Sequence, residues 1–370
     1  MDQLAAKILA SDAKFAISIT GGGIQSIGEL LGHGGASNNV IEVVIPYSQH
    51  SLQDYLKKEP TKYCSEETAR YMATIARDRC FKSLGNKEGF GVGVTCSLAR
   101  IKGERPDRHH EIHIAICSEK YTHSYSLSCE GRDREEEEFW AKRLVLEAIA
   151  FHAMSKNNDF IVIPNNLSRC KQNKSSPAWL SDNPIVEMSW GAPVNTNYIF
   201  PGSFNPIHAA HIKMCNYVFK KTNKKVNLEI SLQNVDKLSI DHIEAEDRAK
   251  QIFLCNEKSI NKVIFTQAPK FHQKVELFPN STFLMGADTF SRIVSTPWDE
   301  IEKYEFIKII KKNNCKFLIF DRKGTNLKED NETLLDGFAK DICEFVPLDS
   351  YEDDGISSTK IRKNKNVIAN

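Results

Sequence analysis

The sequence of 370 residues lacks the features that mark several classes of protein. Its ten cysteines form no Cys-x-x-Cys pair, and its N-terminus has no basic start followed by an apolar stretch. It contains no run of about 18 apolar residues, the length that a membrane-spanning helix needs. The formal net charge is only +1. These absences argue against a zinc ribbon, a thioredoxin-like site, a signal peptide, a membrane helix, and a strong field that attracts nucleic acid or membranes.

What the sequence contains is typical of a globular protein: 41% of its residues are hydrophobic and 26% are charged, over a length that suits two ordinary domains. The cysteines are scattered singly in a long chain, which predicts reduced, mostly buried thiols and an intracellular protein. We therefore expect a cytoplasmic location, with the nucleus left open. We expect no nucleic-acid partner and no membrane partner.

Three zones differ in composition. Residues 1–156 alternate short β-rich runs with helical patterns, which predicts an α/β domain. Residues 157–195 are rich in Asn, Ser, Lys and Pro and show no periodicity, so they are interpreted as a linker. Residues 196–370 again alternate strands and helices, which predicts a parallel, doubly wound sheet. The predicted fold class is α/β, with two α/β domains.

The stretch FPGSFNPIHAAH, residues 200–211, combines an apolar strand with a turn and two histidines. Gly202 and Ser203 form a turn that brings backbone N–H groups close to the end of the strand. Pro206 precedes a predicted helix. The carboxyl end of a strand that faces the N-terminus of a helix binds phosphate readily.

His208 and His211 lie three residues apart, so both project from one side of the first helical turn. Two imidazoles and nearby N–H groups can hold several phosphate oxygens. For an isolated His-x-x-His pattern, ordinary polar residues at a helix start are the favoured interpretation. A metal site is the third alternative, but no carboxylate neighbours the pair. The strand and the Gly-Ser turn favour phosphate binding.

A second segment, GISSTKIR at residues 355–362, offers groups of the same kind. The hydroxyls of Ser357, Ser358 and Thr359 can cap a helix and donate hydrogen bonds. Lys360 and Arg362 can neutralise phosphate. The alternative is a plain capped, basic helix start.

Together the two segments resemble the signatures of the nucleotidylyltransferase superfamily, a strand followed by [ST]-F-[DN]-P-x-H-x-G-H and a late I-S-S-T-x-I-R. The resemblance spans about residues 195–365. Within the superfamily, GSFNPIH, MGADTF (residues 285–290) and ISSTKIR look most like nicotinamide or nicotinate mononucleotide adenylyltransferases. One position departs from the pattern, because Ala210 stands where the superfamily has Gly. We expect weakened or altered nucleotide binding there.

The resemblance implies adenylyl transfer from ATP to a pyridine mononucleotide, with Mg²⁺, to give a dinucleotide and pyrophosphate. It implies a Rossmann-like domain in which His208, His211 and Arg362 are catalytic. The nucleotide-binding residues it implies are Gly202, Ser203, Phe204, Asn205, Lys237, Gly286, Asp288, Ser357, Ser358 and Thr359. An exposed structural lysine is the alternative for Lys237. Three other functions stay open: transfer to another phosphorylated acceptor, ATP hydrolysis, and nucleotide-dependent regulation without turnover.

The first domain carries a glycine-rich turn of its own, SITGGG at residues 18–23, between a strand and a helix. Such a turn can present N–H groups to an oxygen atom. The alternative is a tight turn without a ligand. The run REEEEF, residues 134–139, is interpreted as a solvated, acidic helix start. The trio His109, His110 and His113 is interpreted as surface residues, so no metal site is predicted.

The first domain resembles the C-terminal domain of the CinA family, whose members include nicotinamide mononucleotide deamidases. Its matching positions include Ser48 and the candidate site, which consists of Ser18, Thr20, Gly21, Gly22 and Tyr47. Two family positions differ, with Ile17 in place of Glu and Leu52 in place of Lys. Since a serine nucleophile needs a neighbouring base, we expect a degenerate domain that serves ligand binding, regulation or homo-oligomerisation.

Overall fold

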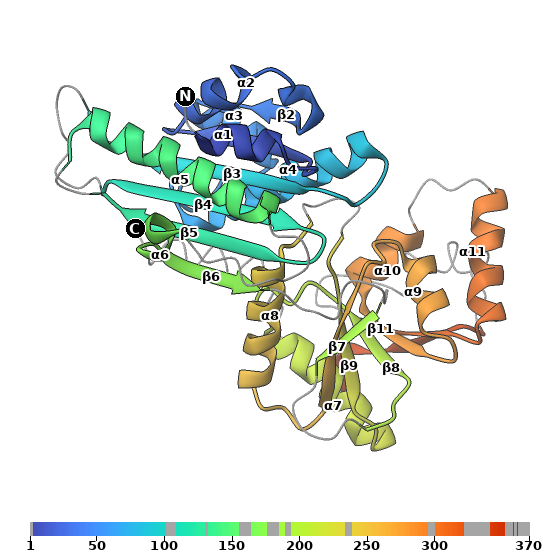
Figure 1. Cartoon of the computed structure of the whole chain (residues 1–370). Helices are drawn as coiled ribbons and strands as arrows, with labels where there is room; N and C mark the ends of the chain where they lie inside the picture. The colour runs from blue at the N-terminus through green and yellow to red at the C-terminus, as the bar shows by residue number, and fades with distance from the viewer. Residues whose placement is uncertain are drawn as a thin grey trace. The chain divides into compact units, whose positions relative to one another are not determined.

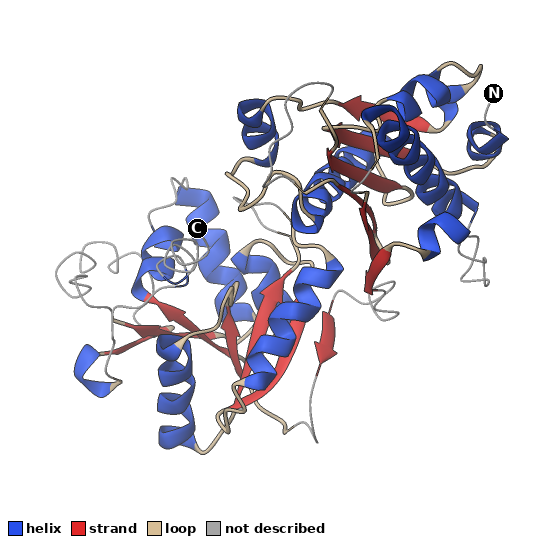
Figure 2. Cartoon of the chain, turned by 90° about the vertical axis from the view of Figure 1, so that its left-hand side faces the viewer, coloured by secondary structure: helices blue, strands red, loops and turns tan. Residues whose placement is uncertain are grey.

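The computed structural model describes residues 3–100, 109–129, 132–154, 164–175, 185–188, 194–233, 239–294, 300–321, 341–351, 358 and 361. The chain divides into two compact units (Figure 1). The first comprises Met1–Ser181 and Lys237–Glu244, and the second comprises Asp182–Asp236 and Ala245–Asn370. In each unit the strands form a central layer flanked by helices (Figure 2), which confirms the prediction of two α/β domains.

The first unit contains a six-stranded sheet in the order β2-β1-β3-β4-β5-β6. Strands β2, β1 and β3 are parallel, and β4, β5 and β6 follow in antiparallel pairs. The strands are β1 (Phe15–Thr20), β2 (Val40–Val44), β3 (Phe90–Ser97), β4 (Glu111–Ser118), β5 (Thr122–Ser128) and β6 (Lys171–Ser175). The helices are α1 (Gln3–Leu9), α2 (Gln25–Leu31), η1 (Ala36–Asn38), α3 (Gln49–Leu56), α4 (Glu66–Leu84), α5 (Arg134–Met154) and α6 (Asn165–Ser168).

Alternation along each strand divides this core between two sets of helices. Ile112, Ile114 and Ile116 of β4 belong to the cluster that includes α1 and α5, whereas Ala115 and Cys117 pack with α4. Helix α4 begins where the Ser65 hydroxyl accepts a hydrogen bond from the Thr68 N–H and ends at Gly85, which is left-handed. These caps fix which residues stand at the N-terminus of α4.

The second unit contains a seven-stranded sheet in the order β13-β12-β11-β8-β9-β10-β7. All its pairs are parallel except β10 with β7. The strands are β7 (Ile185–Met188), β8 (Tyr198–Pro201), β9 (Val226–Ser231), β10 (Ile260–Thr266), β11 (Thr282–Gly286), β12 (Lys316–Phe320) and β13 (Cys343–Val346). The helices are α7 (Ala209–Thr222), α8 (His242–Leu254), α9 (Phe271–Leu277), α10 (Ala287–Val294), α11 (Glu300–Lys312) and η2 (Leu348–Ser350).

The predicted linker, residues 157–195, is drawn too broadly. It contains α6 and β6, which belong to the first unit, and β7, which belongs to the second. β6 and β7 are short edge strands, and β6 (KQNKS) is polar throughout. Such strands are stabilised by backbone pairing with a neighbour rather than by an apolar face, so hydrophobic periodicity does not reveal them.

Candidate functional site

The order of strands in the second sheet fixes where a ligand can bind. From β8 the chain adds β9 and β10 on one side, then returns to add β11, β12 and β13 on the other. β8 and β11 are therefore adjacent and parallel, and the strand order reverses between them. Ligands of open α/β sheets bind outside the carboxyl ends of the strands at such a reversal. Both GSFN, which follows β8, and Gly286, which ends β11, lie at this edge.

The turn after β8 is held by backbone contacts. The Gly202 N–H donates to the carbonyl of Glu229 at 2.9 Å. A Cβ atom at Gly202 would lie 2.7 Å from the ring of Phe204, so a larger residue would displace this ring. Phe204 is left-handed (φ 42°) and buried, whereas Ser203 is exposed and Asn205 is half-buried. The turn therefore buries one aromatic ring and presents the predicted Ser203 to solvent.

The two predicted histidines stand together at the start of α7. Their rings are stacked, with centroids 3.8 Å apart. The backbone N–H of His208 donates to Nδ1 of His211 at 3.3 Å. Because Nδ1 of His211 is an acceptor, its Nε2 carries the proton of the neutral ring and can donate to a ligand. The Phe204 ring packs against His211 at 5.0 Å, which helps to hold the imidazole in place.

The late motif reaches the first one through Ser358, whose hydroxyl donates to the carbonyl of Pro206 at 3.0 Å. These residues are 152 positions apart in sequence. The contact places Ser358 of the late motif beside the turn after β8. Four predicted site residues lie outside the described part of the chain: Lys237, Ser357, Thr359 and Arg362.

Asp288 lies in the first turn of α10, directly after β11, and its side chain is exposed. The neighbouring Gly286 is half-buried at the end of the strand. Since β11 pairs with β8, the Asp288 carboxylate is placed at the same sheet edge as the turn after β8. Carboxylate oxygens are ligands that Mg²⁺ prefers, together with phosphate oxygens.

Two buried groups that support this edge were not predicted. Arg248 of α8 is 9% exposed and donates from Nη1 to the carbonyl of Ser203 at 3.0 Å. Glu229, fully buried, accepts from Nζ of Lys274 at 2.6 and 2.8 Å, and the Thr266 hydroxyl also donates to it. The Glu229 carbonyl accepts the Gly202 N–H. No local pattern marks these residues, because their burial arises from tertiary packing.

In the first unit, three of the five predicted site residues line a cavity of about 650 Å³: Gly21, Gly22 and Tyr47. Arg100, Arg132 and Arg134 also border it. Ser18 and Thr20 are buried in β1 instead, with exposures of 0% and 6%, and do not line the cavity. Ser18 is therefore poorly placed to act as a nucleophile.

The acidic start of α5 is wrongly predicted to be solvated throughout. Glu137 is fully buried, where it accepts from the Ala99 N–H and lies 2.7 Å from Nδ1 of His110. Glu138 accepts from the Gly23 N–H at 3.0 Å. Of the four glutamates, only Glu135 and Glu136 are exposed. Part of the run tethers the loops around the cavity, which a charge pattern does not reveal.

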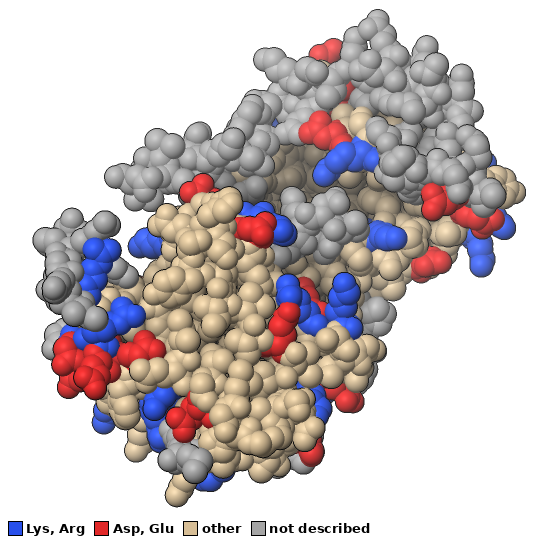
Figure 3. Space-filling model, turned by 90° about the horizontal axis from the view of Figure 1, so that it is seen from above, with Lys and Arg blue, Asp and Glu red and all other residues tan. Residues whose placement is uncertain are grey.

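Two further observations concern the charge of the surface and the hydropathy of the helices. On the face seen in Figure 3, basic side chains alternate with acidic ones, in keeping with the net charge of +1. Within the described residues, no helix has both the length and the hydropathy needed to cross a bilayer.

Residues 199–364 match the family model described as cytidylyltransferase-like. The C-terminal part of the chain is therefore a nucleotidylyltransferase-like domain, which supports a nucleotidyl transfer function. No curated protein matches the chain.

Solved structures of CinA-type proteins match the N-terminal part of the chain. A competence/damage-inducible protein from Agrobacterium tumefaciens is 21% identical, with a TM-score of 0.34 over 40% of this chain and 92% of its own. A CinA-superfamily protein from Klebsiella pneumoniae is 13% identical, with a TM-score of 0.31 over 40% and 94%. One from Escherichia coli is 14% identical, with a TM-score of 0.32 over 39% and 83%.

Proposed function

We propose that the second unit transfers the adenylyl group of ATP to nicotinamide or nicotinate mononucleotide, giving a dinucleotide and pyrophosphate. The contact between Ser358 and Pro206 carries the proposal, because it joins one residue of the late motif to the turn after β8, at the reversal of the strand order. The match to a cytidylyltransferase-like model over residues 199–364 supports the reaction class. The pyridine acceptor rests on the sequence resemblance.

The reaction needs no protein nucleophile. The acceptor phosphate attacks the α-phosphorus in line, one P–O bond forms, and the bond to the leaving pyrophosphate breaks. The protein contributes position and charge stabilisation. The Nε2 groups of His208 and His211 donate to phosphate oxygens, and Ser203 contacts phosphate from the turn. Ser357, Ser358 and Arg362 would bind the β- and γ-phosphates. Asp288 would hold Mg²⁺, which neutralises phosphate charge when bound.

A second function, ligand binding without turnover, is proposed for the first unit. Three arginines and three carboxylates, those of Asp133, Glu135 and Glu138, border its cavity, which suits a polar ligand with both hydrogen-bond donors and acceptors. The buried Ser18, and Leu52 (3% exposed) where a base would be needed, argue against deamidation.

Product analysis tests the transferase. The full chain is incubated with ATP and Mg²⁺ and either nicotinamide mononucleotide, its acid form, phosphopantetheine or no acceptor, and products are separated by chromatography. We expect a dinucleotide with one pyridine mononucleotide and its loss in His208→Ala. ADP in every reaction would indicate an ATP hydrolase. Nucleotide binding without any product would contradict the proposal and favour the regulator.

A further inference from the structure

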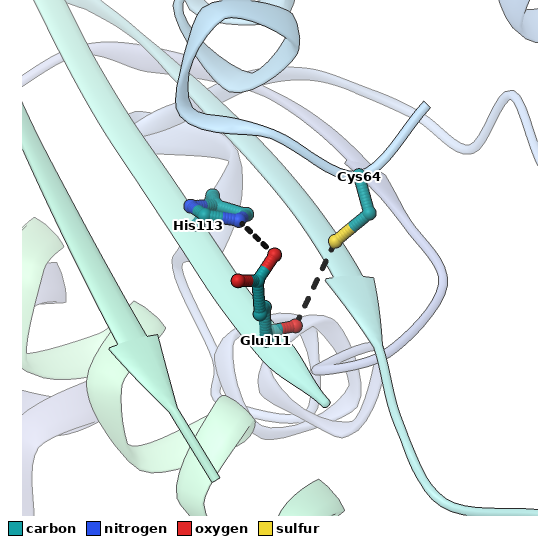
Figure 4. Close-up of side chains that lie close together, drawn as sticks. All are labelled: Cys64, Glu111 and His113. Atoms are coloured by element: carbon teal, nitrogen blue, oxygen red, sulfur yellow. Dashed lines mark hydrogen bonds and ion pairs between the residues drawn. The ribbon is translucent and has the colours of Figure 1, made fainter. Parts of the chain in front are cut away.

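Three side chains that bind metals meet in the first unit, on the α4 side of its sheet. Glu111 and His113 are two residues apart on β4 and therefore share a face. Cys64 precedes Ser65, the residue that caps α4. One ligand atom from each residue lies within 4.8 Å of the other two (Figure 4). The sequence does not reveal this cluster, because Cys64 is far from the other two residues along the chain.

The histidine is oriented as metal-binding histidines are. Its ring is buried, and Nδ1 lies 2.8 Å from the hydroxyl of Ser126, its paired residue on β5. Nε2 faces the Glu111 carboxylate, 3.2 Å from Oε2. A hydrogen bond to one ring nitrogen fixes the tautomer and direction of the other, and such partners strengthen metal binding.

The cysteine is also held in place. The Thr95 hydroxyl donates to the carbonyl of Tyr63, and the Thr68 hydroxyl donates to the carbonyl of Lys62. These bonds fix the loop on the N-terminal side of Cys64, whose thiol lies 3.7 Å from the carbonyl of Glu111. The N-terminus of α4, a helix of 19 residues, follows directly.

We propose that Cys64, Glu111 and His113 bind a divalent transition metal ion, with Zn²⁺ preferred. One thiolate, one imidazole and one carboxylate form a set that suits Zn²⁺. Two N and O ligands at about 2.1 Å in a tetrahedral site lie roughly 3.4 Å apart, close to the 3.2 Å between Nε2 and Oε2.

The chemistry of the site follows from its three ligands. Binding requires the thiol to lose its proton and Sγ to move toward the other two ligands. The thiolate and the carboxylate then balance the charge of the ion. Three protein ligands leave a fourth position for water or an exchangeable ligand. His110 is not part of the set, because its Nδ1 bonds to Glu137. The site is independent of the transfer reaction of the second unit.

The test uses the full chain, stripped with a chelator and titrated with Zn²⁺ and, separately, Co²⁺. We expect one equivalent of metal and, with Co²⁺, a thiolate charge-transfer band. Cys64→Ser and His113→Asn should each weaken binding at least 100-fold. Ser126→Ala, which removes only the orienting bond, should weaken it about tenfold. Cys255→Ser, at an exposed cysteine, should change nothing.

Circular dichroism checks that each variant is folded. The proposal fails if Zn²⁺ binds the parent and Cys64→Ser equally, or if bound Co²⁺ shows no thiolate band. Alkylation of Cys64 supplies a second readout, since bound Zn²⁺ should protect this thiol and leave Cys255 reactive. Rapid alkylation that Zn²⁺ does not slow would indicate a reactive thiol beside a histidine instead, and would overturn the metal site.

Discussion

The turns after β1 and β8 each follow an inner strand with a parallel neighbour on both sides, yet their polar groups have different partners. In the first turn, the Gly23 N–H already donates to the Glu138 carboxylate, and Arg134 contacts the Gly21 carbonyl. The second turn is bordered by two imidazoles and a buried guanidinium at the Ser203 carbonyl. An anion at the first turn would have to displace a carboxylate, whereas an anion at the second would meet donors. Two turns at similar positions in their sheets therefore need not bind the same ligand.

The largest expected effect concerns the support of the second turn. Glu229→Leu should lower the free energy of unfolding of the second unit by about 3–5 kcal/mol, because it leaves the Lys274 ammonium buried and unpaired. Adding Lys274→Met should restore most of this loss. Hydrogen exchange in β9 and α9 measures it.

Glu187→Gln serves as the matched control. It breaks the ion pair with Lys262, in which Glu187 is 49% exposed, and should cost less than about 1 kcal/mol. Equal losses in Glu229→Leu and Glu187→Gln would mean that burial does not set the strength of the pair.

The next effect concerns the first turn. Gly21 is left-handed (φ 81°), and a Cβ there would lie 2.0 Å from the Cys96 carbonyl. Gly21→Ala should destabilise the first unit by about 3 kcal/mol, since backbone must move, without changing nucleotidyl transfer. Gly28→Ala, with open space around it, should be neutral or stabilising. Denaturation curves measure the change in stability of each variant, and the product assay measures its nucleotidyl transfer. Loss of transfer in Gly21→Ala would show that the two turns are coupled.

Acid should weaken the first unit through its buried histidines. Burial lowers the pKa of His123 to about 4 and holds the pKa of His152 well below its usual range. The unfolded chain takes up protons below about pH 6.5 while these rings stay neutral, so stability is lost as pH falls from about 6.5 to 4. The lowered pKa of His123 alone corresponds to a loss of about 3 kcal/mol in the free energy of unfolding over this range of pH.

Denaturation at several pH values, followed by hydrogen exchange in β5 and α5, measures this loss. Lys174 also disfavours the charged form of both histidines, so Lys174→Gln should flatten the profile slightly. His123→Asn should reduce the pH slope by about one proton. An unchanged slope would assign the acid sensitivity to other groups.

The smallest expected effect concerns Ala210, which stands where the nucleotidylyltransferase pattern has glycine. Ala210 is 8% exposed in the first turn of α7, between the two histidines. Ala210→Gly should raise transfer several-fold if the missing glycine weakens nucleotide approach. It should also cost up to about 1 kcal/mol of stability, because glycine disfavours helix. Initial rates and a melting curve measure both. If Ala210→Gly binds nucleotide but transfers the adenylyl group no faster, the result would favour nucleotide-dependent regulation without turnover.

Alternating patterns predicted the two α/β domains, because hydrophobic periodicity is set locally and strands pair with neighbours. The two sequence motifs predicted His208 and His211 as site residues and indicated that Ser358 lies near the turn after β8. The rest depends on tertiary packing. Glu229 and Lys274 resemble surface residues in sequence, and Arg248 lies in an ordinary amphipathic helix. Glu137 lies within an acidic run whose burial no charge pattern reveals. Cys64 meets His113 only because α4 packs on β4.

The two short strands β6 and β7 determine where the chain can be divided. Each is the edge strand of a different sheet and pairs antiparallel with its neighbour, β5 in one sheet and β10 in the other. A cut at residue 156 would remove β6 and expose the hydrogen-bonding edge of β5, and a start at residue 196 would expose that of β10. Unpaired edges recruit other chains and promote aggregation. A division of the chain between these two strands keeps both edges covered, so β6 and β7 each protect their own sheet against self-association.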